Sequence, residues 1–381
     1  MTAFGCSLLI AALLAYCLNW LALLPWRKAS AGLFWTERAA LLYPARASSA
    51  LNFWLIIMSL LCARLIFHPG SSPIPPAIGS LLGALGGTYP MTREIYPDLT
   101  FRVWLQIVAS QLALGALGVL VIGGFALAMP GDFGWVTWLL LCLFLLIHFA
   151  VRLGLGIRLM RWLRILRKPP ERLTRIVGEV AGDMGVSVRA TWVMRSVASN
   201  AMAFTTTRDL AFTDRFLEQH PDDEVRAVCA HELGHLTEGR WILAARFTGG
   251  LWAIPLVLAR PISARYGFEA VAIPALVAWL IPLLLKRLFR GMEVRADGIA
   301  AAKVPDSIVY ARALERMYRN NQMPAVMPSG RTRVHPDLYD RMTAVGAKPE
   351  YPRPLPPKSR SWTSWLLGTV AAVLAIVVYM S

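Results

Sequence analysis

His231-Glu232-Leu233-Gly234-His235 lies inside an apolar, helix-forming run, with Val228-Cys229-Ala230 before it and Leu236 after it. On a helix, residues four positions apart share one face, so both imidazoles can reach a single metal ion. Glu232 follows the first histidine directly, where its carboxylate can contact a water molecule on that metal. Zinc peptidases combine two neutral nitrogens, an activated water and a carboxylate base in this way. The stretch therefore predicts a helix that carries a zinc-dependent hydrolytic site.

The composition is too apolar for an ordinary soluble protein, because 56% of the 381 residues are hydrophobic and only 16% are charged. Runs of about 20 apolar residues can cross a bilayer as helices. Such runs cover Phe4–Leu24, Leu51–Phe67, Val103–Met129, Trp135–Val151, Trp241–Leu258, Phe268–Leu285 and Trp362–Met380. Arg246 interrupts Trp241–Leu258, which could instead be a re-entrant or chamber-lining helix or a continuation of the motif helix. We expect a mainly α-helical, multi-pass membrane protein.

The basic residues are distributed as in a membrane protein. The formal net charge is +16, and one cluster follows the fourth apolar run directly: Arg152, Arg158, Arg161, Arg164, Arg167, Lys168, Arg172 and Arg175. Basic residues beside a membrane helix mark the cytoplasmic side and lie against anionic lipid headgroups. The cluster therefore argues for contact with the lipid bilayer and against nucleic-acid binding.

The same cluster predicts the orientation of the chain. If it is cytoplasmic, the amino terminus and all catalytic segments are cytoplasmic, and the carboxyl terminus lies outside. The first loop conflicts with this orientation, because it would place four basic residues outside: Arg27, Lys28, Arg38 and Arg46. An early segment that does not cross the membrane would remove the conflict.

Five segments follow from the hydropathy pattern. Residues 1–151 form an N-terminal membrane region of about four apolar helices, with a loop rich in Pro and Gly over His68–Arg102. Residues 152–240 form a cytoplasmic-side catalytic segment with the motif helix, and 241–290 contain two further apolar helices. Residues 291–350 form a second catalytic segment, and 351–381 form a proline-rich spacer and a C-terminal membrane helix.

The catalytic segments contain signals for both helices and strands. Helical spacing over Glu171–Met184 predicts an amphipathic helix that Gly185 ends. Strands are expected within Val186–Met194, Ser199–Thr207 and Leu210–Thr213. The motif helix begins near Pro221, with proline at the first helical position and acidic residues after it. Further helices are expected over about Leu288–Ala302, from Pro305-Asp306 to about Asn320, and after His335-Pro336.

A third zinc ligand is needed, because two histidines and a water leave a tetrahedral site one ligand short. No third histidine follows the motif at the spacing of metzincins. Glu293 and Asp297 stand four residues apart on a predicted helix and share one face. One carboxylate can bind zinc while the other accepts the free N–H of a ligand histidine. The sequence thus predicts a site completed by a carboxylate.

The sequence resembles the M48-type integral-membrane zinc metallopeptidases, the Ste24- and HtpX-like family, from about residue 170 to 345. Asn200-Ala201-Met202-Ala203-Phe204 is similar to the family's Asn-Ala-x-Ala-Phe edge strand, and Ala227–His235 is very close to its motif helix. Two hydrophobic segments before Glu293-x-x-x-Asp297 match as well, as does His335-Pro336 followed by Arg341. The resemblance implies a gluzincin-like α+β catalytic domain with a small edge-strand sheet, in a bacterial inner membrane.

The resemblance also implies roles at the metal. His231, His235 and Glu293 are expected to bind one Zn²⁺ per chain. Asp297 is expected to contact a zinc-bound histidine. Glu232 is expected to act as general base toward the water and later as general acid toward the leaving amine.

Further roles concern the substrate. Asn200, Ala201 and Ala203 belong to the edge strand that the resemblance pairs with an extended peptide, through main-chain hydrogen bonds. His335 is expected to help stabilise the oxyanion. Arg341 is expected either to orient the site or to bind a carboxylate.

We therefore expect a membrane-embedded zinc metalloendopeptidase that cleaves membrane-associated or precursor polypeptides. One alternative is a site-2-type intramembrane protease, against which the charged flanks Asp222–Arg226 and Glu238–Arg240 argue, because charges at membrane depth are costly. Another is an inactive scaffold or chaperone with a vestigial zinc site. The intact Glu232 argues against the scaffold, because a structural zinc needs no base.

Overall fold

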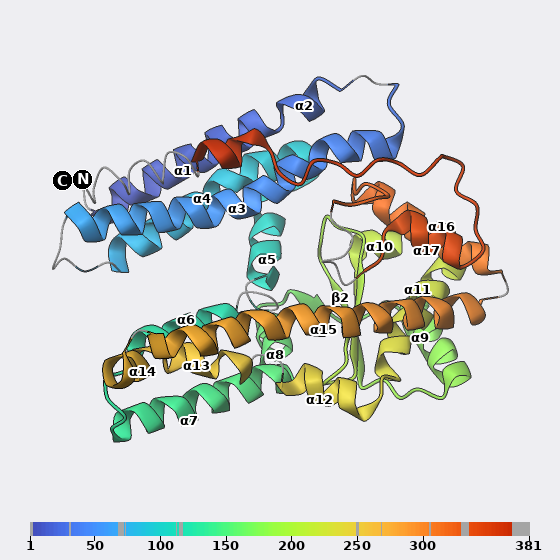
Figure 1. Ribbon diagram of the computed structural model, residues 1–381. Coiled ribbons are helices and arrows are strands. Elements are labelled where there is room, and N and C mark those ends of the chain that lie inside the picture. The colour runs from blue at the N-terminus through green and yellow to red at the C-terminus, as the bar shows by residue number, and fades with distance from the viewer. Residues whose placement is uncertain are drawn as a thin grey trace. The chain divides into compact units, whose positions relative to one another are not determined.

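The computed structural model describes residues 3–29, 32–67, 72, 74–111, 113, 117–248, 251–267, 269–304, 306–328 and 335–367. These residues are mostly helical and contain a four-stranded sheet (Figure 1), which confirms the prediction of a mainly α fold with a small sheet. The chain forms two compact units. Unit 1 comprises Met1–Trp104, Tyr318–Ser329 and Glu350–Ser381, and unit 2 comprises Leu105–Met317 and Gly330–Pro349.

Unit 1 contains more helix than the sequence pattern predicted. Helix α1 (Ala3–Ala22) and the second half of α3 (Trp35–Phe67) cover the first two apolar runs, with the short α2 (Leu24–Arg27) after α1. Helix α4 (Ile74–Ile95) covers most of His68–Arg102, which we predicted as a loop from its proline and glycine content. That prediction is wrong.

Three glycines explain why this segment is a helix. Gly79, Gly83 and Gly87 recur every four residues on the face of α4 that meets α1. A Cβ atom on Gly79 or Gly83 would overlap a backbone carbonyl of α1, so only glycine permits this close approach. Small residues at this spacing are typical of closely packed membrane helices. The glycines therefore serve helix packing and not a flexible loop.

The apolar part of unit 2 is a group of helices with unequal lengths. It comprises α6 (Leu117–Ala128), α7 (Trp135–Ala150), α13 (Ile254–Val257), α14 (Ala259–Tyr266) and the first half of α15 (Glu269–Ala302). Met129, Phe144 and Val257 form its buried centre. Helix α7 is followed by η2 (Val151–Leu155), where Gly154 has a positive φ of 98° and the chain is kinked, and then by α8 (Gly156–Trp162).

Two predicted apolar runs are not single helices. Val103–Met129 divides into α5 (Phe101–Gln111) and α6. Trp241–Leu258 divides into α12 (Arg240–Thr248), a 3₁₀ turn, η3 (Leu251–Ala253), and α13, which has proline in its first turn. In contrast, Phe268–Leu285 and the helix expected over Leu288–Ala302 are one continuous helix, α15, of 34 residues. The apolar stretch and the Glu293–Asp297 stretch therefore belong to the same continuous helix.

Two helices of the described chain are long and apolar enough to cross a membrane, judged by length and composition. They are Ala3–Ala22 and Trp135–Trp162. The larger number of spans that we predicted is therefore not confirmed. The last predicted run, Trp362–Met380, lies outside the described residues from position 368 onward.

The sheet of unit 2 has the strand order β1-β2-β4-β3. Its strands are β1 (Leu166–Arg167), β2 (Ala190–Met194), β3 (Ala201–Phe204) and β4 (Asp209–Thr213). The central strands β2 and β4 are parallel, and each outer strand is antiparallel to its neighbour. The three predicted strands are confirmed with shorter or shifted bounds. Strand β1 was not predicted, because two residues carry no alternating pattern.

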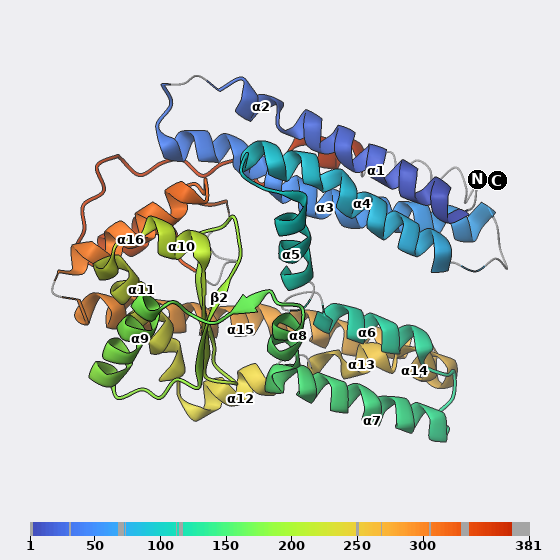
Figure 2. The same cartoon turned by 180° about the vertical axis from the view of Figure 1, so that it is seen from behind.

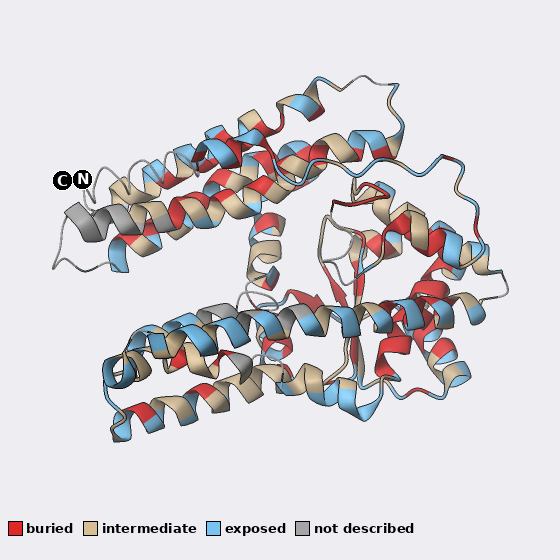
Figure 3. Ribbon diagram, viewed as in Figure 1, coloured by how far each residue is buried: buried red, intermediate tan, exposed pale blue. Residues whose placement is uncertain are grey.

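Helix α9 (Glu171–Met184) has the bounds that its spacing predicted, and Gly185 ends it in the left-handed conformation at φ 63°. Its apolar face packs on α11 (Asp222–Leu236), and both belong to one core with residues of β4 such as Phe212. Buried residues concentrate on α11 (Figure 3). Figure 2 shows α15 passing from the apolar helices to this catalytic region. The motif helix is thus held in the core, where its side chains have little freedom.

Candidate metal centre and active site

Helix α11 positions the His-Glu-x-x-His stretch. Pro221 has extended backbone angles and is the N-cap residue of the helix. The helix therefore begins at Asp222, one residue later than we predicted. The acidic residues of the first turn lie at the positive end of the helix dipole. From Ala227 to Leu236 every side chain is buried. The histidines therefore occupy a fixed, poorly solvated part of the helix.

Small residues bring α11 and α15 together. A Cβ atom added to Gly234 would lie 3.4 Å from the Cα and Cβ atoms of Ala296, which is itself buried. Arg295 adds a clamp from α15, donating hydrogen bonds to the backbone oxygen of Gly234 at 3.3 Å and to Oγ1 of Thr237 at 2.8 Å. This close crossing allows Glu293 of α15 to face the histidines of α11.

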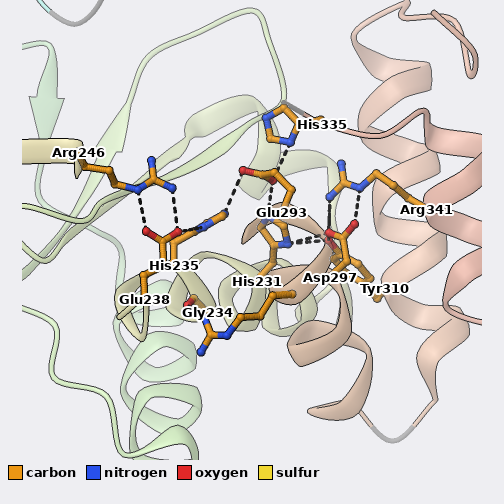
Figure 4. A network of polar contacts seen from close by, with 11 residues as sticks. His231, Gly234, His235, Glu238, Arg246, Glu293, Asp297, Tyr310, His335 and Arg341 are labelled. Atoms are coloured by element: carbon orange, nitrogen blue, oxygen red, sulfur yellow. Dashed lines mark hydrogen bonds and ion pairs between the residues drawn. The ribbon is translucent and has the colours of Figure 1, made fainter. Parts of the chain in front are cut away.

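The three predicted metal ligands lie together (Figure 4). His231, His235 and Glu293 are all buried and each offers one atom within 4.8 Å of the others. Nε2 of His231 lies 3.6 Å from Oε2 of Glu293, and Nε2 of His235 lies 3.5 Å from Oε1. These separations are longer than an ordinary N–H···O hydrogen bond.

The arrangement fits a zinc ion. Two ligand atoms that are each about 2.1 Å from one zinc at a tetrahedral angle are about 3.4 Å apart. The observed 3.5 and 3.6 Å between the imidazole nitrogens and the carboxylate oxygens are close to this value. Two imidazoles and one carboxylate are also a ligand set of catalytic zinc sites. The residues present therefore suit Zn²⁺.

The charges around the centre favour a cation. Burial opposes protonation of His231, but the carboxylates of Asp297, Glu293 and Glu232 outweigh it and raise its pKa to about 9. Burial would raise the pKa of Glu293, but His231 and His335 outweigh this effect and hold its pKa well below the usual range. Burial likewise opposes ionisation of Asp297, whose pKa is lowered by His231 and Arg341. Glu293 and Asp297 are therefore ionised at neutral pH.

A buried polar cluster holds His231 from behind. Its Nδ1 atom lies 3.0 Å from Oδ1 of Asp297 and 2.8 Å from the hydroxyl of Tyr310. That hydroxyl donates to Asp297 at 2.7 Å. Arg341 donates to both carboxylate oxygens of Asp297 at 2.8 and 2.7 Å and to Tyr310 at 3.0 Å. Asp297 holds a proton on Nδ1, which leaves Nε2 as the nitrogen of His231 that would bind a metal.

This geometry bears on the two roles that we considered for Arg341. Its side chain is only 7% exposed, and its guanidinium is occupied by Asp297 and Tyr310. It binds a carboxylate of the chain itself. The contacts therefore favour the orienting role over contact with substrate.

His235 has a second carboxylate at its own Nδ1 atom, which lies 2.9 Å from Oε1 of Glu238. Glu238 and Glu224 belong to the charged flanks of the motif, and their side chains are only 3% and 1% exposed. Each buried charge is paired with arginine, Glu238 with Arg246 and Glu224 with Arg316. These two residues therefore do not indicate exposure to water.

In the sequence, Glu232 lies between the two histidine ligands, whereas His335 follows Glu293. Glu232 is 8% exposed and stands between the two histidines on α11. His335 precedes α17 (Leu338–Ala344), and its side chain is 57% exposed. Its Nδ1 atom lies 2.7 Å from Oε2 of Glu293, so it reaches the metal ligands from the open side (Figure 4). Its predicted contact with an oxyanion stays a prediction.

The predicted substrate strand is an outer strand of the sheet. Ala201 and Ala203 lie on β3, which pairs with β4 on one edge and has no other strand partner among the residues described. Asn200 precedes it and is exposed; its backbone oxygen accepts from the backbone N–H of Thr213, and its backbone N–H donates to Oγ1 of Thr213. Strand β3 also contacts α11. An extended peptide on its free edge would run beside the motif helix.

Two parts of the site escaped the sequence analysis. Tyr310 lies on α16 (Ser307–Asn320), and nothing in its spacing connects it to His231. Glu238 and Arg246 follow the motif closely, and the three-residue step from His235 to Glu238 was a signal that a contact was possible.

Comparison with known proteins agrees with this site. The profile of peptidase family M48 matches residues 167–348. Protease HtpX of Chromohalobacter salexigens is 30% identical over 207 residues, covering 44% of this chain and 69% of the relative. Protease HtpX of Hahella chejuensis is 26% identical over 205 residues, covering 45% and 70%, and that of a Pseudomonas putida strain is 24% identical over 220 residues, covering 48% and 74%.

The fold, the buried motif helix and these similarities together show that the chain is of the protease class. The chain belongs to peptidase family M48. Within that family it is similar to the proteins named Protease HtpX.

Proposed function

We propose that this protein is a zinc-dependent endopeptidase that acts at a membrane on membrane-associated or precursor polypeptides. One observation carries the proposal: the ligand atoms of His231, His235 and Glu293 lie within 4.8 Å of one another, with Glu232 on the same helix as both histidines. When bound, Zn²⁺ acts as a Lewis acid that activates water and polarises a peptide carbonyl.

The chain's own residues would then carry the proton. Glu232 accepts the proton of the attacking water and passes it to the amine that leaves. Its low exposure, 8%, limits competition from bulk solvent. His335, whose Nδ1 atom lies 2.7 Å from Glu293, stabilises the negative charge that develops on the carbonyl oxygen.

Substrate binding would use the free edge of β3. Main-chain hydrogen bonds to Ala201 and Ala203 hold an extended segment without reading its side chains, and Asn200 lies at the start of that edge. This mode suits an endopeptidase that accepts varied polypeptides. It also requires the substrate to be unfolded locally, because a folded segment has no free main-chain groups.

The membrane proposal rests on exposed apolar helices and on basic residues. Helices Ala3–Ala22 and Trp135–Trp162 have the length and composition of spans. Along α7, Trp135, Trp138 and Leu146 are exposed, which suits contact with lipid. The basic residues after this helix support a catalytic region on the cytoplasmic side, as we expect for a bacterial inner membrane.

A Glu232→Gln variant tests the function. Cleavage of a fluorescently labelled unfolded polypeptide by the detergent-purified chain should fall by about 10²–10⁴-fold, while zinc content stays at one ion per chain. Glu218→Gln, which changes an exposed glutamate on α10 (Asp214–Gln219), should cleave at the wild-type rate. Removal of zinc by a chelator should abolish cleavage, and added Zn²⁺ should restore it.

The same variant separates the enzyme from a scaffold. In cells, uncleaved membrane polypeptides should accumulate with Glu232→Gln and not with Glu218→Gln. If neither wild type nor Glu232→Gln cleaves any polypeptide, and the cellular phenotype persists in the variant, the protein is a scaffold and the proposal fails.

A further inference from the structure

The carboxylate of Glu238 lies at the second ring nitrogen of His235. Oε1 of Glu238 is 2.9 Å from Nδ1, and the Glu238 side chain is 3% exposed (Figure 4). Glu238 comes just after α11 ends, so its side chain can turn back onto the last helical turn. The buried carboxylate therefore meets the histidine at the nitrogen that does not face Glu293.

Arg246 holds this carboxylate. Its Nε atom donates to Oε2 of Glu238 at 2.7 Å, and its Nη2 atom donates to Oε1 at 2.8 Å. Such a two-pronged contact fixes the plane of a carboxylate, which a single ammonium group cannot do. Glu238 is therefore oriented as well as neutralised.

Arg246 also contacts the helix that carries the third ligand. Its guanidinium carbon lies 4.7 Å from the ring centroid of Phe289. Phe289 is on α15, four residues before Glu293 and so one turn away on the same face. Arg246 thus links the end of α11, the helix α12 and the ligand-bearing turn of α15.

Resting on the proposed zinc function, we propose that Glu238, held by Arg246, is a positioning residue that fixes the ring and tautomer of His235 for metal binding. A carboxylate at Nδ1 keeps the proton there, leaves Nε2 free, and raises the basicity of the ligand. The pair acts on zinc through His235 and touches neither substrate nor water at the reaction centre.

The competing explanation is a structural ion pair that closes the turn between α11 and α12. An ion pair needs the charge of Glu238, whereas orientation of His235 needs an acceptor oxygen at Nδ1. Glu238→Gln removes the charge and keeps an oxygen at the same reach, and Glu238→Ala removes both. These two variants therefore separate the explanations.

The test measures zinc affinity by competition with a chromogenic chelator and records the visible absorption spectrum of the Co²⁺-loaded full chain in detergent. Glu238→Ala should raise the zinc Kd by about 10–100-fold and change the Co²⁺ spectrum. Glu238→Gln should recover a large part of the affinity. Glu179→Ala, which removes an exposed carboxylate paired with Arg226 of α11, should match wild type in both measurements.

Two results would overturn the inference: wild-type zinc affinity and spectrum in a folded Glu238→Ala, or equal loss of affinity in Glu238→Ala and Glu238→Gln. If Glu238→Ala does not fold, Arg246→Lys decides, because lysine keeps a cation and loses the fork. A raised Kd with a changed Co²⁺ spectrum then supports the inference, and an unchanged spectrum rejects it. A wild-type chain that binds no zinc would instead reject the proposed function itself.

Discussion

The two metal-binding histidines are held in different ways. His235 contacts Glu238 three residues later, and Glu238 contacts Arg246 eight residues further on. His231 contacts Tyr310, which is 79 residues away, together with Asp297, which Arg341 holds across 44 residues. The first group is local in sequence, and the second needs three further helices to be in place.

The two groups also differ in burial. Arg341 is 7% exposed and Arg246 is 27% exposed, whereas the carboxylates that they hold, Asp297 and Glu238, are both buried, at 8% and 3%. A buried charge without a partner is far more costly than one that water can reach. The His231 group therefore connects the metal centre to the stability of unit 2, whereas the His235 group mainly sets the orientation of one ring.

The largest effect should come from Arg341→Ala. It leaves Asp297 as a buried carboxylate without its arginine, which should lower the free energy of unfolding by about 3–5 kcal/mol. Arg246→Ala, the matched change in the other group, should cost less, because Arg246 is 27% exposed and its removal lets water reach the carboxylate of Glu238. Thermal unfolding of the purified proteins measures both. Equal losses in the two variants would remove the distinction between the groups.

Asp297→Asn should act on the metal more than on the fold. It keeps the size of the side chain and an acceptor oxygen at Nδ1 of His231 but removes the charge, so the zinc Kd should rise by about 10-fold, less than on loss of the acceptor. Chelator competition measures this change. The control is Asp306→Asn, an exposed residue whose side chain accepts from the backbone of Ile308 and can still do so as asparagine. Unchanged zinc affinity with impaired cleavage would place Asp297 at the substrate instead.

Tyr310→Phe should have the smallest effect. The ring still stacks on His231, at a centroid separation of 5.9 Å, and the hydroxyl contacts with His231, Asp297 and Arg341 are lost. The free energy of unfolding should fall by about 1 kcal/mol. Its zinc Kd should change less than that of Asp297→Asn, because Asp297 remains 3.0 Å from Nδ1. A larger change would make Tyr310 the main partner of His231.

Much of the catalytic region could be predicted from short-range patterns. The bounds of α9 followed from its apolar spacing and from Gly185, and the motif helix followed from an acidic first turn and an apolar run. The pairs His231/His235 and Glu293/Asp297 each share a helix face at four-residue spacing. These patterns are readable because they depend only on helix geometry.

Most of the failures came where distant contacts override composition. The composition of α4 predicts a loop, but the segment is a helix whose Gly79, Gly83 and Gly87 pack closely on α1. Trp241–Leu258 read as one apolar helix, yet it divides into short pieces. Arg341 was assigned two roles, and only its buried contact with Asp297 distinguishes them. The outcomes at α4 and Arg341 depend on residues distant in sequence, whereas the division of Trp241–Leu258 has a local signal, the proline in the first turn of α13.

By itself, the sequence determined which side chains could act together: two histidines and a glutamate on α11, and two carboxylates on one face of α15. Spacing along a helix is a local property of the chain, so it needs no fold. The tertiary structure decided which carboxylate faces which nitrogen. That choice follows from the close crossing of α11 and α15 at Gly234 and Ala296, because only packing sets the distance and rotation between two helices.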